Sequence, residues 1–438
     1  MAMNDAEHRP LAGIRALELA EVWAGPFCGA LLGDMGADVI KIESVQRIGR
    51  GPIRPRDGNP NYPDGEPGER PWNRGANFNG VNRNKLGITL DLTSTEGVDA
   101  FLDLVNLSDL VFSNYKFGVL DSFGIGYDTL RRVRPDIIML EMPGYGNTGP
   151  YREYRSMGMT LDAIMGHSSL RGYPDLDRSF LTPVHHPDAV GGVTGVFAAC
   201  AALHHRARTG HGQLIDLAQS ETFISHIGEA FLEYGMTGRV RGPRGNRHPA
   251  MAPHGCYPCL GDDKWVTIAV RDEDEWEAFC RALGMPELAA DRRFATLEAR
   301  LENQDELDAL IGRWTASQDR YEATRHLQGY GIPAGPVLEA GGDIYDDPHL
   351  QEREYFQFVD HPDAGPHLLS GPIWKMSGAP EPLNNPTPSL GQDNERVLGR
   401  LLGLPDEVLQ GLEEENIIGT VPLEGADLGG VRRLANRT

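Results

Sequence analysis

Strand-like and helix-like segments alternate over the first third of this chain, and this alternation limits the possible fold more than any other feature. The strand-like segments are short, apolar and rich in branched side chains, and they occur at residues 14–19, 37–43, 87–91, 110–114 and 136–142. Helical patterns follow the first and third of them, at residues 27–35 and 94–107. Neighbouring parallel strands need a long crossover connection, usually a helix. The pattern therefore predicts an α/β fold with a parallel, doubly wound sheet.

The chain has 438 residues, which is too long for one hydrophobic core and predicts about two or three domains. The expected parts are the first part of a large domain (residues 11–225), a linker (226–252), a small domain (253–330), and a return linker with the C-terminal part of the large domain (331–438). Further elements are expected as strands at 214–217, 264–270 and 368–376 and as helices at 189–208 and 393–402. Residues 45–80 interrupt the alternation and predict a long ordered loop over a site.

The formal net charge is −22 at pH 7. Proteins that bind nucleic acid or anionic membranes present basic patches to these partners, so the charge argues against both. The longest apolar runs are too short or too polar to span a bilayer, and the first ten residues lack the apolar region of a signal peptide. We therefore expect a cytoplasmic protein.

The cysteines are scattered along the chain and do not suggest a disulfide framework. Cys256 and Cys259 form a CxxC motif, but no second CxxC follows and only His254 is nearby. His185 and His186 are adjacent in an extended segment, so their side chains point to opposite faces and cannot easily share a metal ion. We expect no metal site.

Asp188 follows Pro187 and precedes a run of small apolar residues that predicts a tightly packed helix. A carboxylate at a helix start meets free backbone N–H groups and the positive end of the helix dipole, so it stays ionised and oriented. The glycines that follow would let a large ligand approach the backbone closely. These residues alone leave two interpretations open: a helix N-cap, which they favour, or a nucleophile.

Residues 144–149 match the GxGxxG pattern of dinucleotide-binding loops and follow a strand. However, Pro150 and a polar stretch come next instead of a helix, and the acidic residue that would bind a ribose is missing. The better interpretation is a glycine loop at the carboxyl end of a strand, where α/β folds bind ligands. No GxSxG motif indicates a serine hydrolase.

Several separate segments resemble the class III CoA-transferases, the family of formyl-CoA, carnitine and bile-acid CoA-transferases. They occur in the family's order between residues 11 and 402, as LAGIRALEL, LGDMGADVIKIE, NKLGITLDL, SNYK, GYGNTGP, RTGHGQ and GIPAGPV. The resemblance implies a Rossmann-like large domain, a smaller inserted α+β domain and an interlocked homodimer. It also implies that coenzyme A thioesters and carboxylic acids are the substrates, with no permanently bound cofactor.

The family's nucleophile is an Asp ahead of the small-residue helix that leads to the TGxGQ turn, and this position is Asp188. The resemblance also assigns contacts with coenzyme A or its acyl group to Val22, Trp23, Ala24, Arg47, Leu90, Asn114, Tyr115, Lys116 and Tyr145. Trp23 and Ser44 stand where oxalate-specific members carry Gln and a phosphate-binding Arg. Oxalate is therefore not the expected acceptor, and Arg47 or Arg50 is expected to replace that Arg.

The resemblance implies that Asp188 attacks the donor thioester and forms an acyl-aspartyl anhydride and then an aspartyl-CoA thioester. The family also contains α-methylacyl-CoA racemases, which pair the Asp with an upstream His to exchange a proton. That His aligns with Met157, so the alternative function, an acyl-CoA isomerase or racemase, lacks its second base. A nucleotide-binding or non-enzymatic protein is the remaining alternative.

Overall fold

The computed structural model describes residues 8–50, 55–182, 184–380 and 385–426. The chain divides into two compact units. The first contains residues up to 165, 183–231 and the chain from 352 onward, and the second contains 166–182 and 232–351. The domain boundaries expected above stay a prediction, because a compact unit need not fold on its own. Within the described residues, no helix is both long and apolar enough to cross a membrane.

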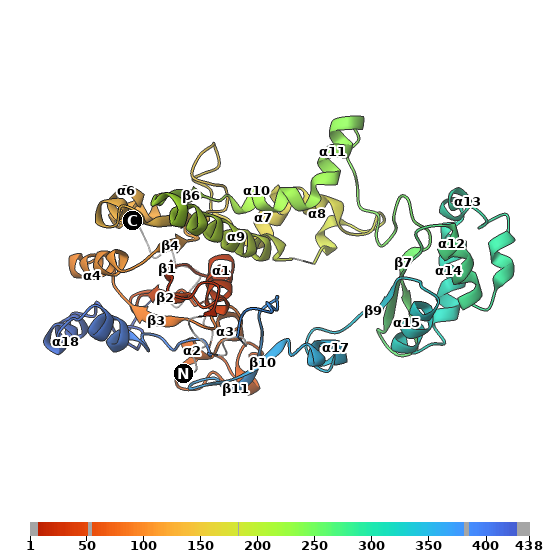
Figure 1. Cartoon of the computed structure of the whole chain (residues 1–438). Helices are drawn as coiled ribbons and strands as arrows, with labels where there is room; N and C mark the ends of the chain where they lie inside the picture. Colours follow the sequence, from red (N-terminus) through yellow and green to blue (C-terminus); the bar gives the residue numbers. More distant parts are fainter. Residues whose placement is uncertain (1–7, 51–54, 183, 381–384, 427–438) are drawn as a thin grey trace, which may run out of the picture. The chain divides into compact units, whose positions relative to one another are not determined.

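The first unit is built around a sheet of six parallel strands, as the sequence predicts (Figure 1). The strands are β1 (Arg15–Leu19), β2 (Asp38–Glu43), β3 (Leu86–Thr89), β4 (Leu110–Ser113), β5 (Ile138–Glu141) and β6 (Leu214–Asp216). Their order in the sheet is β3-β2-β1-β4-β5-β6, so the chain runs outward from β1 and then crosses back to β4. In such sheets, ligands bind outside the carboxyl ends of the strands where the order reverses, here β1 and β4.

The other elements of the first unit are helices, helical turns and one hairpin. They are α1 (Ala24–Asp34), η2 (Pro63–Gly65), α2 (Pro71–Arg74), α3 (Ala76–Asn79), α4 (Thr95–Asn106), α5 (Val119–Ser122), α6 (Tyr127–Val133), α7 (Gly158–Ile164), α9 (His186–Thr209), α10 (Gln219–Ile224), η4 (Ser225–Ile227), β10 (Phe356–His361), β11 (Gly365–Ser370), the π-helical η6 (Glu395–Leu401) and α18 (Asp406–Glu414). The helices α11 (Gly228–Thr237) and α17 (Pro348–Glu352) contain unit boundaries.

Both faces of the sheet are covered, because successive strand side chains point to opposite sides. Leu17 and Leu19 of β1 belong to a core that includes side chains of α4, α6 and α18. Ala16, between them, belongs to a second core with side chains of α1 and α9. The large unit is therefore a three-layer α/β/α structure, which explains why its strands are apolar on both faces.

Glycines allow α1 and α9 to pack closely. A Cβ on Gly192 would lie 2.9 Å from the carbonyl oxygen of Ala24, and a Cβ on Gly195 would lie 3.0 Å from the Met142 side chain. Both distances are shorter than ordinary van der Waals contacts, so a larger residue would push the neighbouring groups apart. The small residues of α9 thus serve helix packing, as the sequence predicts.

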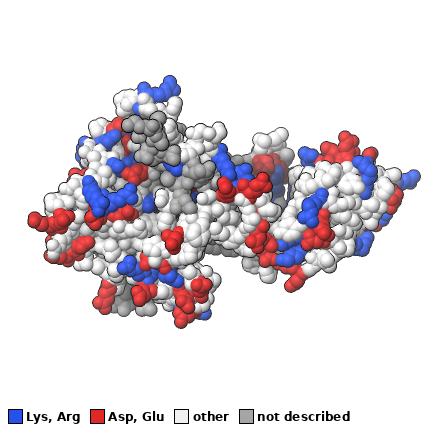
Figure 2. Space-filling model, turned by 60° about the horizontal axis from the view of Figure 1, so that its bottom comes forward, with Lys and Arg blue, Asp and Glu red and all other residues white. Residues whose placement is uncertain are grey.

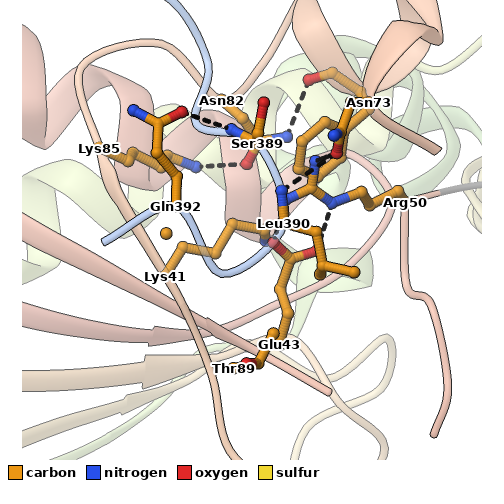
Figure 3. A network of polar contacts seen from close by, with 12 residues as sticks. Lys41, Glu43, Arg50, Asn73, Asn82, Lys85, Thr89, Ser389, Leu390 and Gln392 are labelled. Atoms are coloured by element: carbon orange, nitrogen blue, oxygen red, sulfur yellow. Dashed lines mark hydrogen bonds and ion pairs between the residues drawn. The ribbon is translucent and has the colours of Figure 1, made fainter. Parts of the chain in front are cut away.

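A buried polar network anchors the long loop after β2 (Figure 3). Arg50 donates hydrogen bonds to Oε1 and Oε2 of Glu43, at 2.8 Å and 2.6 Å, and to Oδ1 of Asn73 at 2.8 Å. The same Asn73 oxygen accepts a hydrogen bond from the Leu390 N–H at 3.0 Å. The network joins the loop to β2 and to the returning C-terminal chain, and the loop contains two short helices that the sequence does not indicate.

The second unit contains an antiparallel sheet in the order β7-β8-β9, with a core formed against α12, α14 and α15. Its elements are α8 (His167–Leu170), η3 (Arg178–Phe180), β7 (His254–Pro258), β8 (Trp265–Ala269), α12 (Glu273–Ala282), η5 (Pro286–Ala290), α13 (Leu297–Glu302), α14 (Gln304–Thr315), α15 (Arg320–Gly329), β9 (Ala334–Pro336) and α16 (Gly342–Tyr345). This mixture agrees with the small α+β domain that the family resemblance implies.

The structure differs from the expected elements in three places. The helix expected at residues 27–35 begins earlier, at Ala24, and Pro26 fits in its first turn because N–H groups there have no helical partner. The strands β7, β9 and β10 escape the sequence pattern because two of them are interrupted by Gly and Pro and the third contains charged and polar residues. The helix expected at residues 393–402 is present as Glu395–Leu401, and it is π-helical rather than α-helical.

Charged side chains of both signs are interspersed on the face drawn in Figure 2. Lys and Arg residues lie next to Asp and Glu residues there, and no broad basic surface forms. An anionic ligand on this face would therefore depend on a local group of cations rather than on an extended positive field.

Candidate active site

The ends of β1 and β4 are joined at the switch point of the sheet by one amide side chain. Oδ1 of Asn114, the residue after β4, accepts a hydrogen bond from the Glu21 N–H at 2.9 Å. Its Nδ2 donates a hydrogen bond to the Glu21 carbonyl at 2.8 Å. A Cβ on Gly25 would lie 3.1 Å from the Asn114 side chain, so α1 starts directly against this amide. Asn114 therefore fixes the backbone at the edge where a ligand is expected.

Glu21 brings two predicted site residues together. Its carboxylate forms an ion pair with Arg47, with Nη2 at 2.8 Å from Oε2, and accepts a hydrogen bond from the Tyr115 hydroxyl at 3.3 Å. Burial and then the charge of Glu21 raise the pKa of Tyr115, so its hydroxyl stays protonated and can donate. The sequence does not single out Glu21. The sequence feature that could have identified Glu21 is its position just after the first strand.

Arg47 and Arg50, the two candidates for binding a phosphate, differ in their surroundings. The Arg47 side chain is 53% exposed beside Glu21. Arg50 is buried, and its N–H groups bond Glu43 and Asn73. Arg50 is therefore part of the structural network and does not reach the open edge.

Two buried lysines hold the loop after β1 at both of its ends. Lys41 donates a hydrogen bond to the Ala20 carbonyl, and Lys85 donates one to the Pro26 carbonyl, both at 2.7 Å. The two ammonium groups also pair with Glu18, at 2.8 Å and 2.7 Å, and the three charged side chains are at most 3% exposed. We call Glu18, Lys41 and Lys85 the lysine clamp. Displacing any member would leave buried charge unpaired, so the clamp fixes the course of the loop.

The loop held by the lysine clamp contains three predicted site residues. Val22 has φ of 65°, a left-handed conformation that is strained for a β-branched side chain, and that side chain is 51% exposed. Trp23 stacks on Phe27 with ring centroids 5.2 Å apart. Ala24 is buried. A strained, exposed residue at the carboxyl edge of the sheet is typical of a ligand-binding loop.

The remaining predicted contacts follow β3, β4 and β5. The Leu90 side chain is buried in the hydrophobic core, so it does not reach the open edge. Lys116 pairs with Glu153 at 2.6 Å. The structure thus groups Arg47, Asn114 and Tyr115 around Glu21 and places Leu90 and Lys116 outside that group.

Tyr145 belongs to an aromatic cluster after β5. Its ring meets the rings of Tyr151 and Tyr154 edge to face, with both pairs of centroids 6.0 Å apart. Tyr151 and Tyr154 stack on each other and are about half exposed. Burial raises the pKa of Tyr145. The cluster offers an aromatic surface beside the glycine loop.

Asp188 lies in the first turn of α9, and His185 occupies the N-cap position. The N-cap interpretation of Asp188 is therefore wrong. The helix begins earlier than expected because Pro187 has no N–H that would need a helical partner and its φ already suits a first turn. Asp188 is the acidic residue of that turn, close to the free N–H groups of the helix start.

A glycine of α7 makes room for the Asp188 carboxylate. A Cβ on Gly158 would overlap Oδ2 of Asp188 and would lie 3.2 Å from Nδ1 of His185. Gly192 lies one turn further along α9, and a Cβ there would lie 2.9 Å from Cδ1 of Phe27 as well as from Ala24. The start of α9 therefore borders both α7 and the loop held by the lysine clamp.

Burial raises the pKa of Asp188, and the opposing effects of His185 and the backbone are smaller. Within the described part of the chain, no side chain forms a hydrogen bond or ion pair with this carboxylate. A carboxylate that is removed from water and weakly paired is more basic and more nucleophilic than a solvated one. Perturbed groups of this kind are common at functional sites.

The position that resemblance assigns to the second base of racemases is Met157. Met157 is the N-cap of α7, and its side chain is 57% exposed. The residue that faces the Asp188 carboxylate is its neighbour, Gly158. Among the described residues, no group of three His, Cys, Asp or Glu side chains could hold a metal ion.

Residues 11–394 match the family model described as CoA-transferase family III. A succinyl-CoA–D-citramalate CoA-transferase from Chloroflexus aurantiacus is 34% identical over 417 residues, which cover 94% of this chain and 98% of that protein. A succinyl-CoA:mesaconate CoA-transferase from Haloarcula hispanica is 34% identical over 385 residues, 87% of this chain and 92% of that protein. The crystal structure of a CaiB/BaiF family protein from Brucella suis has 31% identity and a TM-score of 0.77, over 90% of this chain and 99% of that one.

Proposed function

The chain belongs to CoA-transferase family III, and on this premise we propose that it moves coenzyme A from an acyl-CoA donor to a carboxylic acid through covalent intermediates on Asp188. The observation that supports this nucleophile is the placement of its carboxylate. Oδ2 of Asp188 fills the space that Gly158 leaves open, in a partly buried position and without an ion pair among the described residues. A carboxylate is a poor nucleophile in water, and this environment removes much of its hydration.

The reaction begins when an Asp188 oxygen attacks the carbonyl carbon of the donor thioester. The C–S bond breaks, and its electron pair leaves with the sulfur as the thiolate of coenzyme A. The thiolate then attacks the aspartyl carbonyl of the resulting anhydride, which releases the donor acid as a carboxylate and leaves an aspartyl-CoA thioester. The acceptor acid reverses these two steps. Each step exchanges one activated acyl bond for another, so the cycle needs no ATP.

Coenzyme A is proposed to lie along the carboxyl edge of β1 and β4. The loop of Val22, Trp23 and Ala24, with Arg47, Asn114 and Tyr115, would contact the nucleotide and the pantetheine chain. The exposed guanidinium of Arg47 can take a phosphate oxygen, because Arg binds phosphate through several N–H groups. The resemblance adds Lys116 and Tyr145 to these contacts, whereas the Leu90 side chain that it also assigns is buried in the core. The aromatic cluster of Tyr145 offers an apolar wall for the acyl group.

The proposed acyl groups are those of small dicarboxylic acids. The two relatives named above are succinyl-CoA transferases that act on D-citramalate or mesaconate, and all three acids carry two carboxyl groups. A screen of short acyl-CoA donors against mono- and dicarboxylic acids, read by mass spectrometry, tests this class. Equal rates with monocarboxylic acids of the same length would contradict it.

A homodimer in the cytoplasm completes the proposal. The dimer is supported by apolar side chains at helical spacing on α9, where Val193 is 40% and Phe197 is 74% exposed within the chain. Exposed apolar side chains of this kind often belong to an interface. Native mass spectrometry should give a dimer, and a monomer at assay concentration would contradict this part of the proposal.

The central experiment traps the covalent intermediates. Hydroxylamine added after the donor should convert Asp188 to a hydroxamate that peptide mass spectrometry can locate. In D188N this adduct should be absent, and CoA exchange should fall by at least about 10⁴-fold, as for other removed nucleophiles. The matched control is D128N, the same change at an exposed carboxylate on α6, which should react like the wild type. Unchanged CoA exchange in D188N would overturn the proposal.

The alternative function, proton exchange on an acyl-CoA, is tested in deuterated water. The observation that favours this alternative is a ring nitrogen of His185 near Asp188, which could act as the second proton-exchanging group. An isomerase or racemase would introduce deuterium at the α-carbon of a racemisable acyl-CoA without any acceptor acid. A CoA-transferase would leave that position unlabelled.

A further inference from the structure

The start of α9 places His185 beside Asp188. The N-cap and the third residue of a helix are neighbours in space, which is why their side chains often meet. Here both side chains border the same space, because a Cβ on Gly158 would overlap the Asp188 carboxylate and lie 3.2 Å from Nδ1 of His185. In the described part of the chain, no hydrogen bond or ion pair joins the His185 side chain to the Asp188 carboxylate or to another side chain, although the Asp188 N–H donates a hydrogen bond to the His185 carbonyl at 3.2 Å. Its ring is exposed and can therefore meet a ligand.

The proposed reaction moves one negative charge through this space. The charge lies first on Asp188, then on the sulfur of coenzyme A, and then on the carboxylate of the departing acid. No proton is taken up or released in any of these steps, so a general base would not accelerate them. A fixed cation, in contrast, favours the charge that develops on the sulfur and on the departing carboxylate, and such charge stabilisation accelerates the steps that form them.

We infer that His185, in its protonated form, is this cation and a catalytic residue of the transferase. Its imidazolium stabilises in turn the thiolate and the departing carboxylate, which carry the charge after the Asp188 carboxylate has attacked. The inference rests on the proposed function, because it assigns a role within the same covalent cycle. His185 is also the group whose charge acts on the Asp188 carboxyl group in the resting chain.

Other titratable side chains lie on the elements packed against α9 and contribute to any pH profile. They are Asp188, His186, Cys200, His204, His205, Arg206 and Arg208 on α9 itself, Asp162 on α7, Glu221 on α10, His226 on the adjoining η4, Cys28 and Asp34 on α1, and Glu141 on β5. Asp34 is paired with Arg83, and burial keeps the Cys28 thiol protonated by raising its pKa. The test must therefore separate His185 from these groups by substitution.

The test compares H185Q, which removes the charge, with H185K, which keeps it. Wild-type kcat/KM should fall on the alkaline side of its pH profile, because His185 acts only while it carries its proton. H185Q should lower kcat/KM roughly 10- to 100-fold and abolish this alkaline fall. H185K should recover part of the rate and stay flat over the same range, because its ammonium keeps its charge. The matched control is H186Q, whose ring packs beside Phe223 and which should keep the wild-type profile.

Two results would overturn the inference. One is a rate that rises with pH in the wild type and loses that rise in H185Q, which is the behaviour of a base. The other is hydroxylamine capture of Asp188 at the same single-turnover rate in H185Q as in the wild type. A wild type that never forms the hydroxamate would instead overturn the proposed function, so the two failures are distinguishable. Equal denaturation curves for the four proteins would show that the fold is unchanged.

Discussion

Glu18 and Asp188 are two carboxylates of the first unit with opposite surroundings. Glu18 is completely buried and pairs with two lysines, whose ammonium groups also bind the ends of the loop after β1. Asp188 has no ion pair among the described residues, and burial raises its pKa. A buried carboxylate with full pairing holds structure in place, whereas one with little pairing is left reactive.

The same chemical change at the two carboxylates should separate these roles. E18Q leaves two buried ammonium groups without their shared anion, so the free energy of unfolding should fall by about 3–5 kcal/mol. D188N removes a charge that is poorly compensated, so it should change stability by less than about 1 kcal/mol while CoA exchange is lost. Denaturant titration measures both values.

E18Q needs a control for a general effect of lost surface charge. E96Q, in the first turn of α4, removes an exposed carboxylate without a buried partner and should cost only about a few tenths of a kcal/mol. If E18Q were as stable as E96Q, the lysine clamp would not hold the loop. Glu18 would then have no structural role to set against the reactive role of Asp188.

The variant G158A tests whether CoA exchange depends on the position of the Asp188 carboxylate. The added Cβ would overlap Oδ2 of Asp188, so the carboxylate must move, and CoA exchange should fall about 10²-fold through loss of position. Because the change lies beside the reactive group and outside the lysine clamp, the unfolding curve should shift little. G411A in α18 is the matched control, since a Cβ there meets open space. A G158A variant with normal exchange would show that Asp188 does not react from this position.

The strands around the site could be predicted from sequence because each is a short apolar run between turn residues. The arrangement of the charges could not. Glu18 lies in β1 and its two lysines come from β2 and the chain before β3, so their pairing depends on the sheet order. Gly158 is likewise far from Asp188 in the sequence, and its role follows only from the packing of α7 on α9. Local patterns predict elements, whereas pairing between elements depends on topology.

The acid side of the rate profile tests the weak pairing of Asp188. Only the ionised carboxylate attacks, so kcat/KM should fall about tenfold per pH unit below its pKa. Because burial raises that pKa, the fall should begin at a higher pH than the ordinary value of 3.8 allows. Stability should change in the opposite direction: the folded chain binds this proton more tightly than the unfolded chain, so wild type gains stability relative to D188N as the pH falls. An acid limb centred at or below 3.8 would contradict this account.

The smallest effect is expected at Val22, where the lysine clamp forces a strained backbone. Glycine adopts φ of 65° without a steric cost, but it loses more backbone freedom on folding than valine. Relief of a strain of about 1–3 kcal/mol should outweigh that entropy, so V22G should be more stable than the wild type by about 1 kcal/mol. V22A keeps a Cβ and should gain less. If the strain serves to hold the loop for coenzyme A, V22G should also raise KM for the donor more than it lowers kcat. A V22G variant that is less stable than V22A would show that valine is not strained here, and the clamp would then support the loop without distorting it.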